Sequence, residues 1–186
     1  QQPLLAHAPM EPVNCTVHVR PDACELWVGT QVPARAQAAA AELTGLPIER
    51  VEVHNHLLGG GFGRRLDIDF VIQAVKIAKQ VKGPVKVVWT REEDTRHSTF
   101  RPYHYNRLSA SLDARGRPVA WHHRVTASSI LARWAPARFQ NELDGDAIRD
   151  AAGPYGFANV RVEYVREEPP AGITTAFWRG VGHMQN

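Results

Sequence analysis

The residues with the clearest capacity for chemistry form the run Gly59-Gly60-Gly61-Phe62-Gly63-Arg64-Arg65, in which four glycines stand beside two arginines. Because glycine has no Cβ, the backbone N–H groups of such a run can approach an anion closely, and positive φ costs it little. The arginines would add positive charge beside these donors. The pattern predicts an anion- or cofactor-binding loop, for which a plain tight turn is the alternative.

The flanking sequence predicts a strand before this loop and a helix after it. Val51 to His56 alternates between apolar and polar residues. The next segment repeats apolar residues at helical spacing up to Gly83-Pro84 and makes a wide apolar stripe (Phe70, Ala74, Ile77 and Val81, with Val71, Val75 and Ala78 beside them). This order would aim the positive end of a helix dipole at a phosphate. The common phosphate motifs are absent, since a dinucleotide fingerprint needs glycine at Arg64 and no Gly-Lys-Ser/Thr tripeptide exists.

A second cluster, Phe177-Trp178-Arg179-Gly180-Val181-Gly182, again combines arginine, glycine and aromatic residues. If the two loops met, their N–H groups and guanidinium would suit one anionic ligand. Gln31 stands at a third position of interest, between an expected strand, Cys24 to Thr30, and an alanine-rich helix from Pro33 to Leu43. Such corners often carry ligand contacts, and a cap on local backbone is the alternative for Gln31.

The histidines give weaker signals for a metal. His7 and Glu11 are four residues apart, but two nearby prolines argue against a helix, so we expect this pair to fix an irregular segment. His54 and His56 share one face of a strand, yet no third ligand is evident near them. We therefore expect structural histidines and assign no metal ligand in this chain.

The other elements indicate an α+β fold, with a mixed β-sheet and packed helices. A hairpin of Asn14 to Val19 with the strand from Cys24 would place Cys15 opposite Val28, leaving two free, buried thiols. Further along, we expect five features: a buried strand at Val85 to Trp89, a capping box at Thr90 to Glu93, a hairpin around residues 113–116, an irregular excursion at 130–154 and a strand at Val160 to Val165.

Length and composition are those of a globular protein. The 186 residues predict one compact domain, and 22 basic against 19 acidic side chains give an interspersed net charge of +3 that offers little support for a nucleic-acid partner. No apolar run reaches the roughly 20 residues of a membrane helix. Because the chain begins with Gln1 rather than Met, we expect a piece of a longer polypeptide, whose compartment stays open between periplasm and cytoplasm.

Taken together, four motifs resemble the molybdenum-binding large subunit of the xanthine oxidase and aldehyde oxidoreductase family, and its isoquinoline 1-oxidoreductase β-subunit branch above all. They are His-Ala-Pro-Met-Glu-Pro from His7, Gly29-Thr30-Gln31, the glycine loop with His54-Asn55-His56 before it, and Trp178-Arg179-Gly180-Val181-Gly182-His183. The resemblance covers nearly the whole chain. It implies that residues 1–186 are one domain of that subunit, the rest of which lies outside this sequence.

The resemblance also implies a set of cofactor contacts. The residues that match the family's molybdopterin-binding positions are Gln31, Gly60, Gly61, Phe62, Gly63, Trp178, Arg179, Gly180 and Gly182. Gln31 matches a glutamine whose amide contacts an oxygen ligand of molybdenum, with N–H groups around Phe62 and Gly63 on the same side. Such anionic acceptors need preorganised donors rather than bulky side chains.

The implied reaction is oxidative hydroxylation of an aldehyde or an N-heteroaromatic substrate with oxygen from water. Purine substrates are disfavoured, because Arg65-Leu66 replaces the lysine and glutamate that follow the loop in xanthine-oxidising relatives. The family's catalytic glutamate lies beyond Asn186, so no catalytic residue is assigned here and the piece alone should be inactive. Family members imply a small partner with two-iron two-sulfur clusters, a cytosine-dinucleotide form of the cofactor in bacteria, and often a twin-arginine leader.

Three other interpretations remain open at this point. A nucleotide or nucleic-acid binding module would use Arg64, Arg65 and the stretch from His97 to Arg107. A zinc hydrolase would need His7, His54 and His56 to converge. The third alternative is a scaffold fragment that binds nothing by itself.

Overall fold

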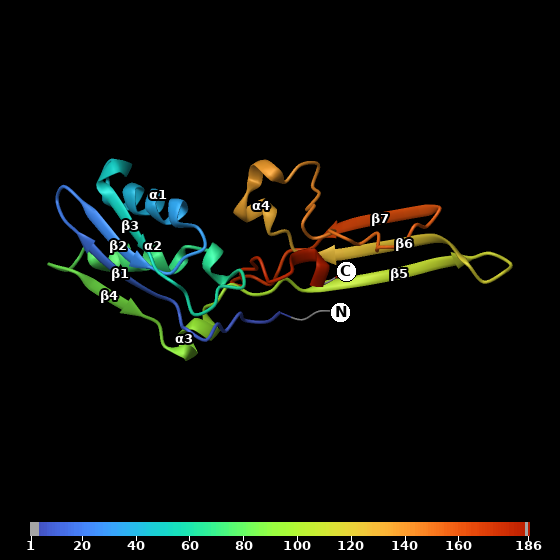
Figure 1. Ribbon diagram of the computed structural model, residues 1–186, viewed down its shortest axis with the longest axis horizontal. Coiled ribbons are helices and arrows are strands. Elements are labelled where there is room, and N and C mark those ends of the chain that lie inside the picture. Colours follow the sequence, from blue (N-terminus) through green and yellow to red (C-terminus); the bar gives the residue numbers. More distant parts are fainter. Residues whose placement is uncertain (1–3, 185) are drawn as a thin grey trace. The chain divides into compact units, whose positions relative to one another are not determined.

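The chain forms two compact units in the computed structural model, which describes residues 4–184 and 186. Residues 6–98 form the α/β unit, and residues 99–186 with Leu4 and Leu5 form the hairpin unit (Figure 1). Each unit builds its own sheet around its own apolar cluster. The single domain expected from the length stays a prediction.

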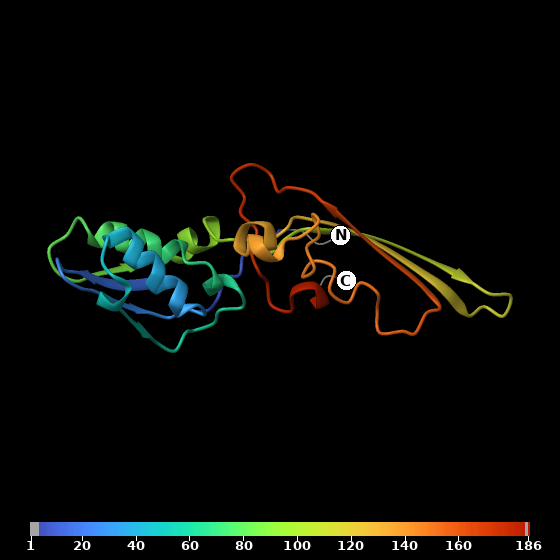
Figure 2. The same ribbon diagram turned by 90° about the horizontal axis from the view of Figure 1, so that it is seen from above.

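The α/β unit is a four-stranded mixed sheet with two helices on one face. Its strands have the order β3-β2-β1-β4, in which β1 is antiparallel to β2 and β4, and β2 is parallel to β3. The strands are β1 (Asn14–Val19), β2 (Cys24–Val28), β3 (Val51–Asn55) and β4 (Val85–Val88). The helices α1 (Pro33–Thr44) and α2 (Asp69–Ala78) pack side by side on this sheet (Figure 2).

The core of this unit lies between the sheet and the helices, where alternate strand residues meet the apolar stripes of both helices. Helix α1 begins with Pro33 and is capped after Thr44 by Gly45, whose φ of 76° allows its N–H to donate to Ala41 O. These bounds confirm the prediction. The hairpin register is also confirmed, since Cys15 lies opposite Val28, and burial raises the pKa of the free Cys15 thiol to about 12.

Two expectations for this unit were wrong in detail. Helix α2 ends at Ala78 rather than at Gly83, and Ile77, at one margin of the expected stripe, is 44% exposed, whereas Val71, Ala74 and Ala78 are buried as expected. Strand β4 is an edge strand rather than a buried one, so its residues alternate between half-buried and exposed. The following helix, α3 (Arg91–Arg96), confirms its expected cap, because Thr90 Oγ1 accepts the N–H of Glu93 at 3.2 Å.

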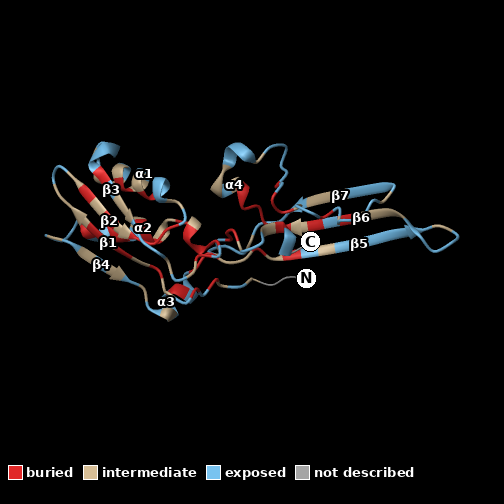
Figure 3. Ribbon diagram, in the orientation of Figure 1, coloured by how far each residue is buried: buried red, intermediate tan, exposed pale blue. Residues whose placement is uncertain are grey.

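The hairpin unit is a three-stranded sheet of β5 (His104–Leu112), β6 (Pro118–Ala127) and β7 (Asn159–Arg166), with β7 parallel to β6. The expected turn is confirmed, since Asp113 Oδ1 accepts the N–H groups of Arg115 at 2.8 Å and Arg117 at 3.0 Å. Much of this sheet is exposed, whereas the α/β unit carries a continuous buried layer (Figure 3).

The excursion between β6 and β7 is irregular, as expected, and it holds one short helix, α4 (Leu131–Trp134). Short 3₁₀ helices occur in both units, at Ile48–Arg50, Arg64–Leu66, Pro136–Arg138 and Val181–Met184. In residues 4–184 and 186, helices are too short or too polar to cross a membrane. The mixed sheets with packed helices confirm the α+β class.

Candidate functional site

The glycine loop, residues 59–63, follows β3 and leads into the 3₁₀ helix Arg64–Leu66. Helix α2 begins only at Asp69, and the carboxylate of that residue already binds Arg64. The partial positive charge at the first turn of α2 is therefore already compensated within the chain by the Arg64–Asp69 ion pair. The loop's own backbone, rather than the helix dipole, has to supply donors to a ligand.

Both arginines after the loop are buried, which contradicts the expectation that they offer charge to a ligand. Arg64 is 2% exposed and binds Asp69 through two hydrogen bonds of 2.7 and 2.9 Å, while Arg65 is 0% exposed. A guanidinium removed from water needs acceptors for its N–H groups, and here protein carboxylates and carbonyls accept those of Arg65 and the two Nη groups of Arg64. A nucleic-acid or phosphate surface built on these two side chains is therefore excluded.

Arg65 joins three separate segments at the base of the loop. Its Nε donates to Gly60 O at 3.0 Å, its Nη1 to Gly29 O at 2.9 Å, and its Nη2 to Glu11 O at 3.1 Å and Glu11 Oε2 at 2.9 Å. The same Glu11 oxygen accepts the N–H of Gly59 at 2.7 Å. These contacts hold the irregular N-terminal segment, the end of β2 and the loop together.

The Glu11 carboxylate confirms the structural role expected for its segment. Burial raises the pKa of Glu11, but the N–H of Gly59, the side chain of Asn14 and the charge of Arg65 outweigh it, so the pKa is lowered overall. His7 is buried in the same irregular segment. Glu11 is therefore an ionised anchor for the loop at neutral pH.

Gln31 lies directly beside the loop. Its side-chain Oε1 accepts the N–H of Gly63 at 3.2 Å, and its own N–H donates to Arg65 O at 3.0 Å. The amide oxygen must face Gly63 N–H, so the amide NH₂ is left as a donor, and within the described chain it meets no acceptor. The Gly63 N–H, which the resemblance placed on the ligand side, is thus already used to orient Gln31.

The loop geometry explains why glycine is needed. A Cβ on Gly61 would lie 2.5 Å from Gln31 Oε1, and one on Gly59 would lie 2.5 Å from the Cβ of Glu11. Gly60 has a φ of 102°, in the left-handed region that favours glycine. Among the described residues, none accepts a hydrogen bond from the N–H of Gly60 or Gly61. The loop therefore offers three donors without protein partners: these two N–H groups and the Gln31 amide.

This donor set fits an anionic cofactor such as molybdopterin, whose oxygen and sulfur atoms are acceptors. Phe62 borders the same loop with a φ of 54°, unusual for a residue with a side chain, and its ring lies against Gly60. An aromatic edge beside unpartnered N–H groups suits a flat ligand with an anionic side. Residues Gly60, Gly61, Phe62 and Gln31 thus lie together at one loop.

The second loop, residues 178–182, lies in the hairpin unit. The N–H of Val181 donates to Trp178 O at 2.8 Å, and Gly180 has a φ of 84°. A Cβ on Gly182 would lie 2.7 Å from Asp146 O, so the loop packs directly on the backbone of the excursion. Arg179 is exposed, and the guanidinium of Arg101 lies 5.8 Å from the centre of the Trp178 ring.

A small cavity lies behind this second loop, with Trp178, Gly182, His104 and Asp144 in its wall. Asp144 is buried and organises the surrounding turn: its carboxylate accepts Ser129 Oγ at 2.8 Å and three backbone N–H groups, those of Leu131, Asp146 and Ala147, at 3.0 Å each. Burial lowers the pKa of His104 to about 4, so this imidazole is neutral at pH 7.

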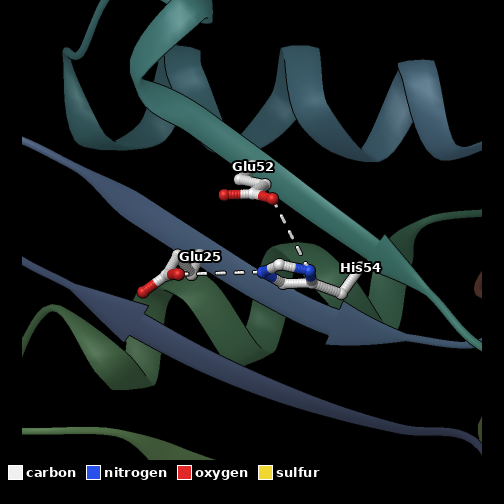
Figure 4. Close-up of side chains that lie close together, drawn as sticks. All are labelled: Glu25, Glu52 and His54. Carbon is white, nitrogen blue, oxygen red and sulfur yellow. Dashed lines mark ion pairs between the residues drawn. The ribbon is translucent and has the colours of Figure 1, made fainter.

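His54 joins two carboxylates on the open face of the α/β sheet, a different cluster from the three histidines that a zinc hydrolase would need. His54 lies between two carboxylates, with Nε2 3.7 Å from Glu25 Oε1 and Nδ1 3.7 Å from Glu52 Oε1 (Figure 4). These pairs involve opposite ring nitrogens, and Glu25 is also bound to Arg20 at 2.6 Å. His56 does not join this cluster, so the three-histidine zinc site is contradicted within the described residues.

Comparison with known proteins decides the family. Residues 1–186 match the family model described as the molybdopterin cofactor-binding domain. The chain belongs to this family. The resemblance to xanthine oxidases and aldehyde oxidoreductases that the motifs indicated is thereby confirmed.

Relatives agree with this assignment. The chain is 33% identical to the isoquinoline 1-oxidoreductase subunit beta of Brevundimonas diminuta, over 100% of this chain and 24% of that protein. It is 29% identical to the molybdenum-binding subunit of the aldehyde oxidoreductase of Escherichia coli, over 67% of this chain and 17% of that protein. The chain thus spans about a quarter or less of the length of these relatives.

The fold is that of the crystal structure of quinoline 2-oxidoreductase from Pseudomonas putida 86. The two agree with a TM-score of 0.78 at 18% identity, over 97% of this chain and 23% of that one. The aldehyde oxidoreductase from Desulfovibrio gigas gives a TM-score of 0.72 at 15% identity, over 97% of this chain and 20% of that one. Both likenesses span 97% of the chain, so the fold of both units recurs in these two structures.

Sequence reasoning missed the residues that hold the site together. Arg65 was assigned to the ligand, and Asp144 was given no role. Only one sequence signal could have pointed to the role of Arg65. Glu11, in the His-Ala-Pro-Met-Glu-Pro motif, is a carboxylate in an irregular segment that cannot supply all of its hydrogen-bond donors. Its partner lies 54 residues away, which no local pattern reveals.

Proposed function

We propose that this chain supplies two walls of a molybdopterin site in a subunit that oxidatively hydroxylates an aldehyde or an N-heteroaromatic compound with oxygen from water. The observation that carries the proposal is the donor set at the glycine loop: the N–H groups of Gly60 and Gly61 and the amide of Gln31, none with an acceptor in the described chain. The family to which the chain belongs binds molybdopterin, which supports this ligand.

When bound, the molybdenum centre would supply the two-electron oxidation of a carbon–hydrogen bond. The residues of this chain would bind and orient the cofactor. Gln31 would donate its amide N–H to an oxygen on the metal, held in that rotamer by Gly63 N–H. Trp178, Arg179, Gly180 and Gly182 would border the cofactor from the hairpin unit, as the resemblance implies. No general base is proposed in this chain, so the isolated piece should be inactive.

The apolar surroundings of the glycine loop favour a weakly polar substrate. Leu57, Phe62 and Met10 are exposed around it, and Leu66 stands where xanthine-oxidising relatives have a polar substrate contact. A relative acts, by its name, on isoquinoline. We therefore propose that the substrate is an aromatic aldehyde or a fused N-heterocycle rather than a purine. From the family resemblance we also propose a partner subunit with two-iron two-sulfur clusters and the cytosine-dinucleotide form of the cofactor.

The test is the molybdenum and pterin content of the full-length subunit, purified with its partner. Gly61→Val should block the approach to the loop, and Arg179→Ala should remove a contact from the second loop. Gly145→Ala is the control, because a Cβ there meets nothing within 4 Å. We expect stoichiometric molybdenum in the wild type and the control, and less in both loop variants. A wild-type complex that is intact and free of molybdenum refutes the proposal.

A further inference from the structure

We infer that Arg65 is a positioning residue that fixes the orientation of the Gly60–Gly61 peptide and so aims the Gly61 N–H at the cofactor. The inference rests on the proposed function for its ligand and on this chain alone for its geometry. A trans, planar peptide group has its C=O and N–H pointing in opposite directions. Whatever holds the carbonyl of such a peptide also sets the direction of its N–H.

Two successive peptides of the loop are held in this way. Gly60 O accepts a hydrogen bond from Arg65 Nε at 3.0 Å, and Gly59 O accepts one from the N–H of Glu11 at 3.1 Å. The N–H groups of Gly61 and Gly60 must therefore face away from the buried arginine and from the N-terminal segment, respectively. These are the two backbone donors that lack acceptors among the described residues.

Such a constraint is needed because a peptide between two glycines rotates easily. Neither residue has a Cβ, and both signs of φ are accessible, so the Gly60–Gly61 peptide could turn over at little cost. A turned peptide would present a carbonyl oxygen, which repels an anionic ligand, where the N–H should be. The contact from Arg65 makes one orientation the stable one.

Arg65 can do this because it is rigid and fully buried. Four hydrogen bonds from its guanidinium reach Gly60, Gly29 and Glu11, and its backbone oxygen accepts the N–H of Gln31 at 3.0 Å and Thr30 Oγ1 at 3.1 Å. One residue thus sets the direction of the Gly61 donor and anchors the main chain of Gln31. A lysine cannot replace it, because three donors on a single nitrogen cannot reach acceptors spread over three segments.

The experiment compares Arg65→Lys and Arg65→Ala with Arg64→Lys in the full-length subunit. Arg64 is the matched control, since it is the neighbouring buried arginine but binds the side chain of Asp69 instead of a loop carbonyl. We measure the molybdenum and pterin content, the melting temperature, and the orientation of the Gly60–Gly61 peptide in crystals of each variant. Arg65→Lys should lower the molybdenum and pterin content about tenfold or more, because the anionic cofactor would lose one hydrogen-bond donor. Arg64→Lys should lose less than half of this content.

The results separate this inference from the proposed function. A turned or mixed Gly60–Gly61 peptide in the Arg65 variants, with partial recovery of cofactor in Arg65→Ala on addition of guanidinium ion, supports the inference. An unchanged peptide, or an equal loss of cofactor in Arg64→Lys and Arg65→Lys, overturns it. If neither Arg65 variant folds, Glu11→Gln tests the same network, and a cofactor content equal to wild type there overturns the inference. A wild-type subunit without molybdopterin instead overturns the proposed function.

Discussion

Replacement of Gly61 by alanine should separate cofactor binding from stability. A Cβ at this position would lie 2.5 Å from Gln31 Oε1 and 2.8 Å from Gln31 Cδ, so the side chain would have to move by about 1 Å to restore an ordinary contact. The hydrogen bond from Gly63 N–H is already 3.2 Å long and would break. Gln31 is exposed and can rotate into solvent, so the backbone need not shift.

The expected cost in folding free energy is small. The lost hydrogen bond is worth about 1 kcal/mol, and alanine restricts the unfolded chain by about 0.4–1 kcal/mol in the opposite direction. This second term applies because the φ of Gly61 lies outside the left-handed region. The two effects nearly cancel, so we expect a change in melting temperature of no more than a few degrees.

The expected cost in cofactor affinity is larger. The displaced Gln31 amide no longer donates to the anionic ligand, and a hydrogen bond to a charged group is worth about 1.5–3 kcal/mol, or roughly a tenfold to hundredfold loss of affinity. The assay is pterin content and melting temperature of full-length Gly61→Ala beside Gly145→Ala. Full cofactor content in Gly61→Ala, or a loss of cofactor matched by a collapse in melting temperature, would refute the reasoning.

Two further predictions concern the hairpin unit. Burial lowers the pKa of His104 from 6.5 to about 4, so between these values the unfolded chain binds a proton that the folded chain does not. The free energy of unfolding should therefore fall as the pH drops from 6.5 to 4, by up to about 3 kcal/mol at roughly 1.36 kcal/mol per pH unit. His104→Gln should flatten this part of the pH profile of unfolding. An unchanged slope in the variant would contradict the assignment to His104. Asp144→Asn should destabilise the full-length subunit by about 2–4 kcal/mol, because an amide NH₂ would face groups that are themselves donors. Urea unfolding of Asp144→Asn is compared with that of Ser129→Ala, which loses one of these hydrogen bonds and about 1 kcal/mol. Equal unfolding midpoints for the two variants would argue against the hydrogen-bond network of Asp144.

Local patterns predicted most of the secondary structure. The Pro33 start and Gly45 stop of α1, the register of Cys15 opposite Val28, and the Thr90 cap all depend on residues close in sequence. The motifs around the glycine loop also indicated the family. Short-range chemistry of this kind is written directly into residue type and spacing.

Burial and long-range pairing could not be predicted in the same way. Strand β4 looked buried because it is apolar, but its place at the edge of the sheet depends on which strand pairs with β1. Arg64 and Arg65 looked like ligand contacts because arginines beside glycines often are. Their burial depends on Asp69 and on Glu11, and the latter comes from a distant segment.

The sequence by itself therefore determined the class of fold, the family and the short list of loop residues that could meet a cofactor. Only the tertiary structure decided how those residues divide their work: Arg65 and Glu11 hold the loop, Gly63 orients Gln31, and Gly60, Gly61 and the Gln31 amide keep unpartnered donors. The physical reason is that a buried guanidinium must be satisfied by acceptors wherever the fold brings them, and that requirement has no fixed spacing along the chain.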